Sequence, residues 1–99
     1  MTETQMFEHM RTQIRTEKLT PLHALSNTLK KAGSEIKPYY KGESHLYVRC
    51  DGIPWDSIST IHFLANSQKL KCRIVALSTT EQFKGQNITI CKPYINIYE

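Results

Sequence analysis

The chain has 99 residues, of which 39% are hydrophobic and 22% are charged, and its 13 Lys and Arg outnumber its 9 Asp and Glu. These values are typical of one folded domain with a single modest core, and they exclude a wholly disordered chain. The net charge of +4 is divided evenly, because residues 1–33 carry five basic and three acidic side chains and residues 34–99 carry eight and six. An evenly distributed excess of positive charge is compatible with binding to nucleic acid or to an acidic protein partner.

The sequence also limits the compartment. It has no apolar run that approaches the length of a membrane span, and Glu3 and Glu8 lie where a secretory signal would be basic and then apolar. Three cysteines without a close pair fit reduced thiols better than a disulfide framework. We therefore expect a cytoplasmic protein without membrane contact.

Residues 1–33 predict a helical hairpin. Thr2 and Gln5 have the spacing of a capping box, and an apolar stripe at helical spacing predicts a first helix over about 3–18. Thr20 followed by Pro21 predicts the start of a second helix, and Gly33 predicts its end. The apolar positions are Met6, Phe7, Met10 and Ile14 in the first helix and Leu22, Leu25 and Leu29 in the second.

Two short helices before a β-hairpin are also found in helix-turn-helix proteins. The second helix would then present His23, Ser26, Asn27, Lys30 and Lys31 to DNA. That fold needs a third core helix, which the sequence does not show before the hairpin, and helix pairs are more often packing elements.

Residues 34–99 predict a ββαββ unit. Residues 36–41 form a strand that Pro38 restricts to the edge of a sheet, and residues 45–50 alternate between apolar and polar side chains, as a half-buried strand does. Pro54 opens a helix that runs to about residue 67, and residues 72–77 form a strand that this crossover returns parallel to the previous one. The helical positions expected to face the sheet are Trp55, Ile58, Ile61, Leu64 and Ala65.

The C-terminal residues predict one more strand. Residues 78–85 are polar and are interpreted as a connection, and residues 87–91 form a strand with Ile88 and Ile90 inward. At Lys92 and Pro93 the alternation changes parity, which predicts a kink or bulge, after which Ile95 and Ile97 face inward. The whole chain is then a single α+β domain, residues 1–99, with a four-stranded mixed, mostly antiparallel sheet.

One candidate site lies on the sheet face that the central helix leaves free. Aromatic rings interleaved with cations can stack on bases and neutralise phosphates. The first hypothesis is therefore a small regulatory protein that binds DNA or RNA without catalysis. Its candidate residues are Arg11 and Arg15 on the first helix, Lys30 and Lys31 on the second, and Lys37, Tyr39, Tyr47, Arg49 and Arg73 on the sheet.

The alternative hypothesis is a modulator, such as one encoded by a phage or another mobile element, that inhibits or adapts a host protein. Val75 and Leu77 face outward and predict that the N-terminal helices or a second subunit cover them, so a homodimer is one arrangement that the sequence allows. Aromatic side chains are frequent hot spots of protein interfaces. The candidate interface residues are Tyr40, Val75, Leu77, Tyr94 and Tyr98.

Catalysis and metal binding have little support in the sequence. The four histidines and three cysteines show no closely spaced pairs of the kind that zinc sites use. The four glycines are too far apart to form a phosphate-binding loop, and Asp51 and Asp56 are explained by a turn and a helix start. We therefore expect a protein that is not an enzyme and that has no metal or cofactor.

Overall fold

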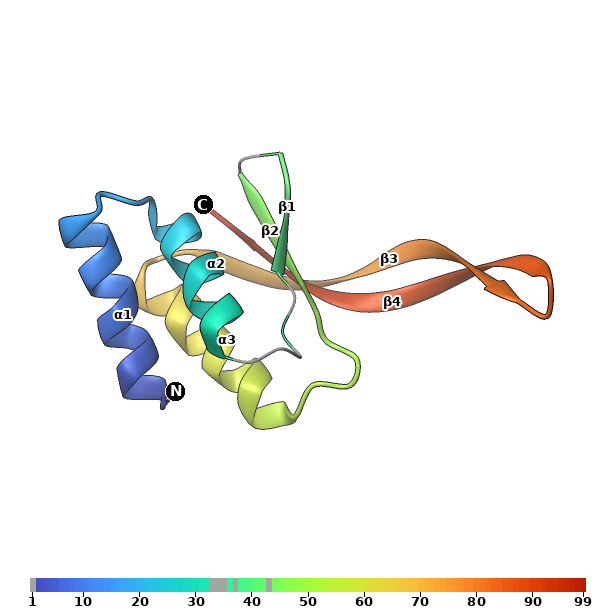
Figure 1. The fold of residues 1–99 in the computed structure, drawn as a ribbon, viewed down its shortest axis with the longest axis horizontal. Coiled ribbons are helices and arrows are strands. Elements are labelled where there is room, and N and C mark those ends of the chain that lie inside the picture. The colour runs from blue at the N-terminus through green and yellow to red at the C-terminus, as the bar shows by residue number, and fades with distance from the viewer. Residues whose placement is uncertain (1, 33–35, 37, 43) are drawn as a thin grey trace.

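The computed structural model describes residues 2–32, 36, 38–42 and 44–99. Within these residues, three helices and a four-stranded antiparallel sheet make the chain an α+β protein, as predicted (Figure 1). The elements are α1 (Glu3–Thr16), α2 (Pro21–Ala32), β1 (Pro38–Lys41), β2 (His45–Arg49), α3 (Trp55–Ser67), β3 (Lys71–Phe83) and β4 (Gln86–Tyr98).

The two N-terminal helices begin where the sequence predicts. The capping box is present, since the Gln5 backbone N–H donates to the Thr2 hydroxyl and the Thr2 N–H donates to the Gln5 side chain. The Thr20 hydroxyl likewise accepts the His23 N–H at 3.3 Å. α1 ends at Thr16, earlier than predicted, because the chain turns at Lys18 with φ of 56°. The predicted stop of the second helix at Gly33 lies outside the described residues.

The strand order is β1-β2-β4-β3, and every neighbouring pair is antiparallel. The prediction of a mixed sheet is therefore wrong. The α3 crossover does return β3 in the same direction as β2, but β4 lies between them. The reason is that Ile95 and Ile97 make β4 apolar enough for a central position, where both are fully buried.

The polar connection predicted for residues 78–85 is also wrong. β3 continues to Phe83, and Lys84 and Gly85 alone form the turn to β4. Their φ values of 49° and 77° are both positive, as a type I′ hairpin turn requires. Polar β-branched residues such as Thr79 and Thr80 favour a strand as strongly as apolar ones do.

The predicted kink or bulge at Lys92 and Pro93 is absent from the fully described β3–β4 pair, whose register runs without interruption from Lys71 opposite Tyr98 to Phe83 opposite Gln86. Side chains of an unbroken strand alternate between the faces of the sheet. Ile88 and Ile90 therefore point to the face opposite that of Ile95 and Ile97, and their predicted inward orientation is wrong.

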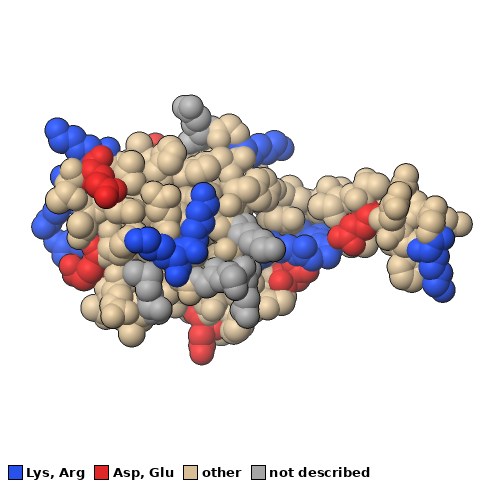
Figure 2. Space-filling view, viewed as in Figure 1, with Lys and Arg blue, Asp and Glu red and all other residues tan. Residues whose placement is uncertain are grey.

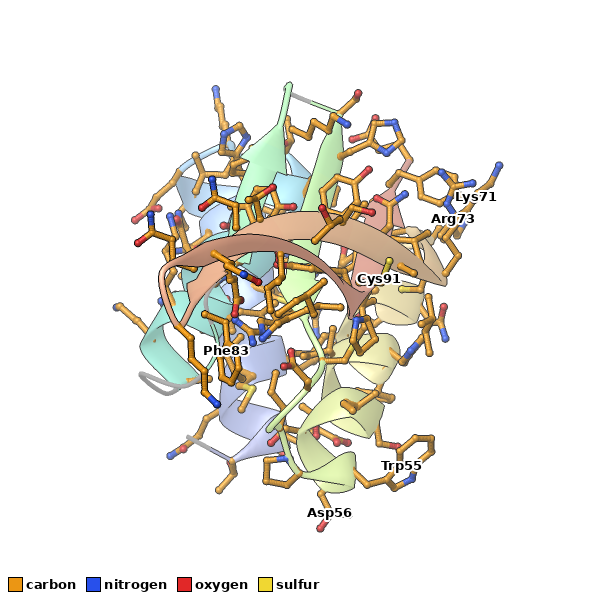
Figure 3. The ribbon with its side chains drawn as sticks, turned by 90° about the vertical axis from the view of Figure 1, so that its right-hand side faces the viewer. Trp55, Asp56, Lys71, Arg73, Phe83 and Cys91 are labelled. Atoms are coloured by element: carbon orange, nitrogen blue, oxygen red, sulfur yellow. The ribbon has the colours of Figure 1, made fainter. Side chains whose placement is uncertain are left out.

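All three helices pack on one face of the sheet, which we call the covered face. The core joins helical residues to Leu46, Val48, Ile95 and Ile97 of β2 and β4. Trp55 was expected in this core, but its side chain is 74% exposed because it lies at the end of α3 farthest from the sheet (Figure 3). The buried helical residues are Met10, Leu22, Ala24, Leu25, Leu29, Ile61, Leu64 and Ala65.

Candidate binding surface

The face of the sheet opposite the helices, which we call the open face, is built by the alternate residues of the four strands. Cross-strand pairing aligns Tyr39 with Tyr47, Tyr47 with Asn96, and Asn96 with Arg73. Val75 and Leu77 lie on this face, so the N-terminal helices do not cover them, although such covering was one of the two arrangements expected for these residues. The open face of the body carries Tyr39, Lys41, His45, Tyr47, Arg49, Lys71, Arg73, Val75, Tyr94, Asn96 and Tyr98.

The tyrosines of the open face pack on one another. The rings of Tyr39 and Tyr47 are stacked with their centroids 5.5 Å apart, and Tyr39 meets the edge of Tyr94 at 6.0 Å. Tyr47 and Tyr94 are 8% and 9% exposed, whereas Tyr39 is 42% exposed. Partial burial, with the neighbouring Tyr94 and Tyr47, raises the pKa of Tyr39. This cluster stabilises the sheet and leaves Tyr39 as the ring most available to a ligand.

Asn96 lies at the centre of the open face and is fully buried. Its Oδ1 is 3.3 Å from Nδ1 of His45, whereas its Nδ2 has no hydrogen-bond partner among the described residues. The Arg73 guanidinium lies 5.1 Å from the centre of the Tyr98 ring, in cation–π contact. Asn96 is thus surrounded by the aromatic and cationic side chains of its neighbours on the open face.

Two of the cations on this side of the sheet already have acidic partners. Arg49 Nη2 donates to Asp51 Oδ2 at 2.8 Å, and Arg49 Nε donates to Asp51 Oδ1. Lys92 Nζ lies 3.4 Å from Glu81 and 3.7 Å from Asp51. The hydrogen bonds from Arg49 hold the pKa of Asp51 below its usual value. A phosphate ligand would have to compete with these carboxylates.

The β3–β4 hairpin projects from the body as a two-stranded arm (Figure 1). β2 ends at Arg49, which pairs with Tyr94. Residues 76–93, which we call the arm, therefore have no third strand beside them among the described residues, although the Cys50 N–H donates to the Pro93 carbonyl at the base of the arm. Phe83 is 59% exposed near the tip. The side chains that extend the open face along the arm are Leu77, Thr79, Glu81, Phe83, Ile88, Ile90 and Lys92.

The arm carries little net charge. It holds Lys84 at the turn, Lys92 near the body and Glu81 between them. Figure 2 shows positive and negative groups intermixed over the visible side of the body, in agreement with the even charge distribution of the sequence. Two large apolar side chains of the arm, Phe83 and Ile88, are nevertheless exposed among its mostly polar residues.

The structure brings together most of the sheet residues that the sequence singles out. Tyr39, Tyr47, Arg49 and Arg73 share the open face, as expected, and Figure 3 shows Lys71 and Arg73 side by side. The candidates that join them there are Val75, Leu77, Tyr94 and Tyr98. Lys37 lies outside the described residues.

The helical candidates lie elsewhere. Arg11 and Arg15 on α1 and Lys30 and Lys31 on α2 belong to the side of the molecule that carries the helices, so the nine nucleic-acid candidates do not form one surface. Ser26, which the helix-turn-helix interpretation placed among the residues that face DNA, is buried in the packing of α2.

Tyr40 was expected at a protein interface, but it points to the covered face. Its hydroxyl donates to the carbonyl of Leu22 at 3.2 Å, and its ring packs 5.0 Å from that of His23. Burial raises the pKa of Tyr40. The side chain therefore anchors β1 to α2.

Sequence reasoning missed His45 and Asn96, and it missed Phe83, Ile88 and Lys92 on the arm. The available signal was weak: Thr79 and Thr80 are β-branched residues that favour a strand, and Gly85 can adopt the positive φ that a two-residue turn needs.

The described residues contain no group of three or more His, Cys, Asp or Glu side chains placed to hold a metal ion. Burial raises the pKa values of Cys50 and Cys72, which disfavours their thiolate forms as nucleophiles. Among the described helices, none has the length and apolarity needed to cross a membrane.

The comparisons with known proteins give no match: no family model, no curated protein and no solved structure is similar to the chain.

Proposed function

We propose that the chain is a non-catalytic binding protein that docks on another protein through its arm and the adjoining open face, and so modulates that partner. The single observation that carries this proposal is the arm. An isolated two-stranded hairpin is marginally stable in water, and exposed contiguous apolar side chains usually mark a contact surface. A protein partner that covers Phe83, Ile88 and Ile90 would supply the packing that the arm lacks.

The charges also favour a protein partner. Arg49 and Lys92 are already neutralised by Asp51 and Glu81. Apart from Lys84 at its turn and the paired Lys92 and Glu81, the arm presents apolar and uncharged polar side chains to a ligand. Contact with nucleic acid is instead dominated by free cations that replace condensed counterions. Tyr39 adds an exposed aromatic side chain beside the arm, of the kind that often anchors protein interfaces.

The test is a variant with a shortened arm. Leu77 pairs directly with Lys92, in the geometry that Phe83 and Gln86 have around the Lys84-Gly85 turn. Residues 78–91 can therefore be replaced by Lys-Gly while the register of the body is kept. Nuclease-treated extract from the cells that naturally make the chain would be passed over the immobilised wild type and the immobilised variant.

We expect the wild type to capture a defined protein other than the chain itself and the shortened variant to lose it. The matched control carries Lys30→Ala and Lys31→Ala on α2, far from the arm, and should capture the same protein as the wild type. Hydrogen exchange on the purified complex should show protection in residues 77–92. Equal capture by the wild type and the shortened variant would refute the proposal.

A second candidate, binding of nucleic acid, is favoured by one observation. Arg73 lies against the Tyr98 ring with Lys71 beside it, and this cation–aromatic group could hold a phosphate and stack a base (Figure 3). Binding to unrelated DNA and RNA fragments should then weaken steeply with salt, and the double change Lys71→Ala, Arg73→Ala should reduce the slope by about two phosphate contacts. Absence of binding at low salt would remove this candidate.

A further inference from the structure

Within the part of the chain that the structure describes, no strand pairs with the outer edge of β3. β3 is the last strand of the sheet, and its residues Lys71–Phe83 pair with β4 alone. Every residue of β3 is described, and the strand contains no proline and no bulge, two of the devices that protect an edge strand. The backbone N–H and C=O groups on this edge are a template for another strand.

β3 is self-complementary when it pairs with a second copy of itself in the antiparallel direction. Leu77 is the middle residue of the strand Lys71–Phe83. If the two-fold axis passes beside Leu77, the two strands overlap over their full length and Leu77 of each copy meets its counterpart. A register shifted in either direction leaves part of the strand unpaired.

The same register matches the charges. Arg73 and Glu81 lie equally far from Leu77 on its two sides, and both point to the open face. Arg73 of one copy is therefore directly opposite Glu81 of the other, and the symmetry makes this pair twice. Opposite charges at directly opposed positions stabilise antiparallel strands, and like charges there destabilise them. Val75 meets Thr79 of the second copy in the same row.

This pairing also accounts for the length of the arm. In the dimer each arm would lie beside the part of β3 that joins the body of the other copy, so it would become part of a broad sheet rather than a free two-stranded hairpin. Ile74, which is 63% exposed near the edge, would gain a cross-strand neighbour in Thr80 of the second copy.

We propose that two copies of the chain pair through the outer edges of their β3 strands, antiparallel and centred on Leu77, into one sheet that joins all the strands of both. The inference goes beyond the proposed function, because it uses the edge of β3 and leaves the open face free for a partner. Failure of the dimer would leave the arm-capture experiment unaffected.

The first experiment reverses the charges one at a time. Sedimentation should show a dimer for the wild type, and R73E or E81R alone should weaken dimerisation on the order of tenfold or more, since each places like charges opposite each other twice. An equimolar mixture of R73E and E81R should dimerise again, because each chain then meets the opposite charge on the other. The double variant R73E/E81R should also recover.

Circular dichroism would verify that each variant is folded, since Glu81 also contacts Lys92 within the chain. A monomeric wild type at high micromolar concentration would overturn the proposal. The proposal would also be overturned if the wild type, R73E, E81R and R73E/E81R all formed dimers equally well.

The second experiment tests the register. In a background where the native Cys50, Cys72 and Cys91 are replaced, L77C should form an intermolecular disulfide on mild oxidation, because directly opposed residues of antiparallel strands have Cα atoms at a disulfide-compatible distance. V75C is the matched control and should remain reduced, since the two introduced thiols would be separated by roughly 13 Å along the strands. Equal crosslinking of both variants, or of neither, would refute the register.

Discussion

Ile90 and Ile95 lie on the same strand, β4, and point to opposite faces of the sheet. Ile95 is fully buried beneath the helices, whereas Ile90 lies on the arm, outside the core. We expect Ile95→Ala to lower the free energy of unfolding by about 2–5 kcal/mol, because it opens a cavity in the core. Ile90→Ala should cost less than about 1 kcal/mol. Urea denaturation of the two variants measures the difference, and equal costs would contradict the assignment of the faces.

The turn at the tip of the arm gives a second prediction. Lys84 and Gly85 both have positive φ, a conformation that asparagine and glycine adopt more easily than other residues. Lys84→Asn should slow hydrogen exchange at the neighbouring residues Gln82 and Phe83, and Gly85→Ala should accelerate it. An unchanged exchange rate in both variants would show that the tip has a different turn.

The pair of Arg49 and Asp51 predicts a response to acid. The pKa of Asp51 is lowered by the hydrogen bonds from Arg49, so the carboxylate is favoured in the folded chain. The stabilisation is fully present above the pKa of the unfolded carboxyl, about 4, and is lost as the pH falls through the lower folded-state pKa.

Thermal melting of the wild type and Asp51→Asn tests this. The difference in melting temperature between the two proteins should be constant near neutral pH and should shrink as the solution is acidified below about pH 4. The difference is expected to be small, because the pair is on the surface. A difference that grows on acidification would mean that Asp51 is not paired in the folded state.

The cysteines should differ in reactivity. Burial raises the pKa values of Cys50 and Cys72, so their reactive thiolates are scarce near neutral pH. Cys91 is exposed on the arm. In the native protein a thiol reagent should therefore modify Cys91 first, as peptide mapping can show, and the three should react at similar rates after denaturation. Faster labelling of Cys72 than of Cys91 would contradict the covering of β3 by α3.

The amino-acid sequence by itself determined the helices, the strand cores and the grouping of Arg49 and Arg73 on one face. These features follow from local physics: capping residues mark the helix starts, and the period of the apolar residues distinguishes a helix from a strand. The sequence could not determine the position of β4, because strand order depends on which strand buries the most apolar area between its neighbours.

The extent of the arm was likewise decided only in the tertiary structure. A polar segment such as residues 78–83 satisfies the rules for a loop and for an exposed strand alike, and only pairing with residues 86–91 distinguishes the two. The change of parity at Pro93 was read from the sequence as a bulge because the same face was assumed to be inward throughout. In the structure β4 stays regular through Pro93. Its C-terminal half packs beneath the helices in the core, whereas its N-terminal half belongs to the arm and has both faces outside the core.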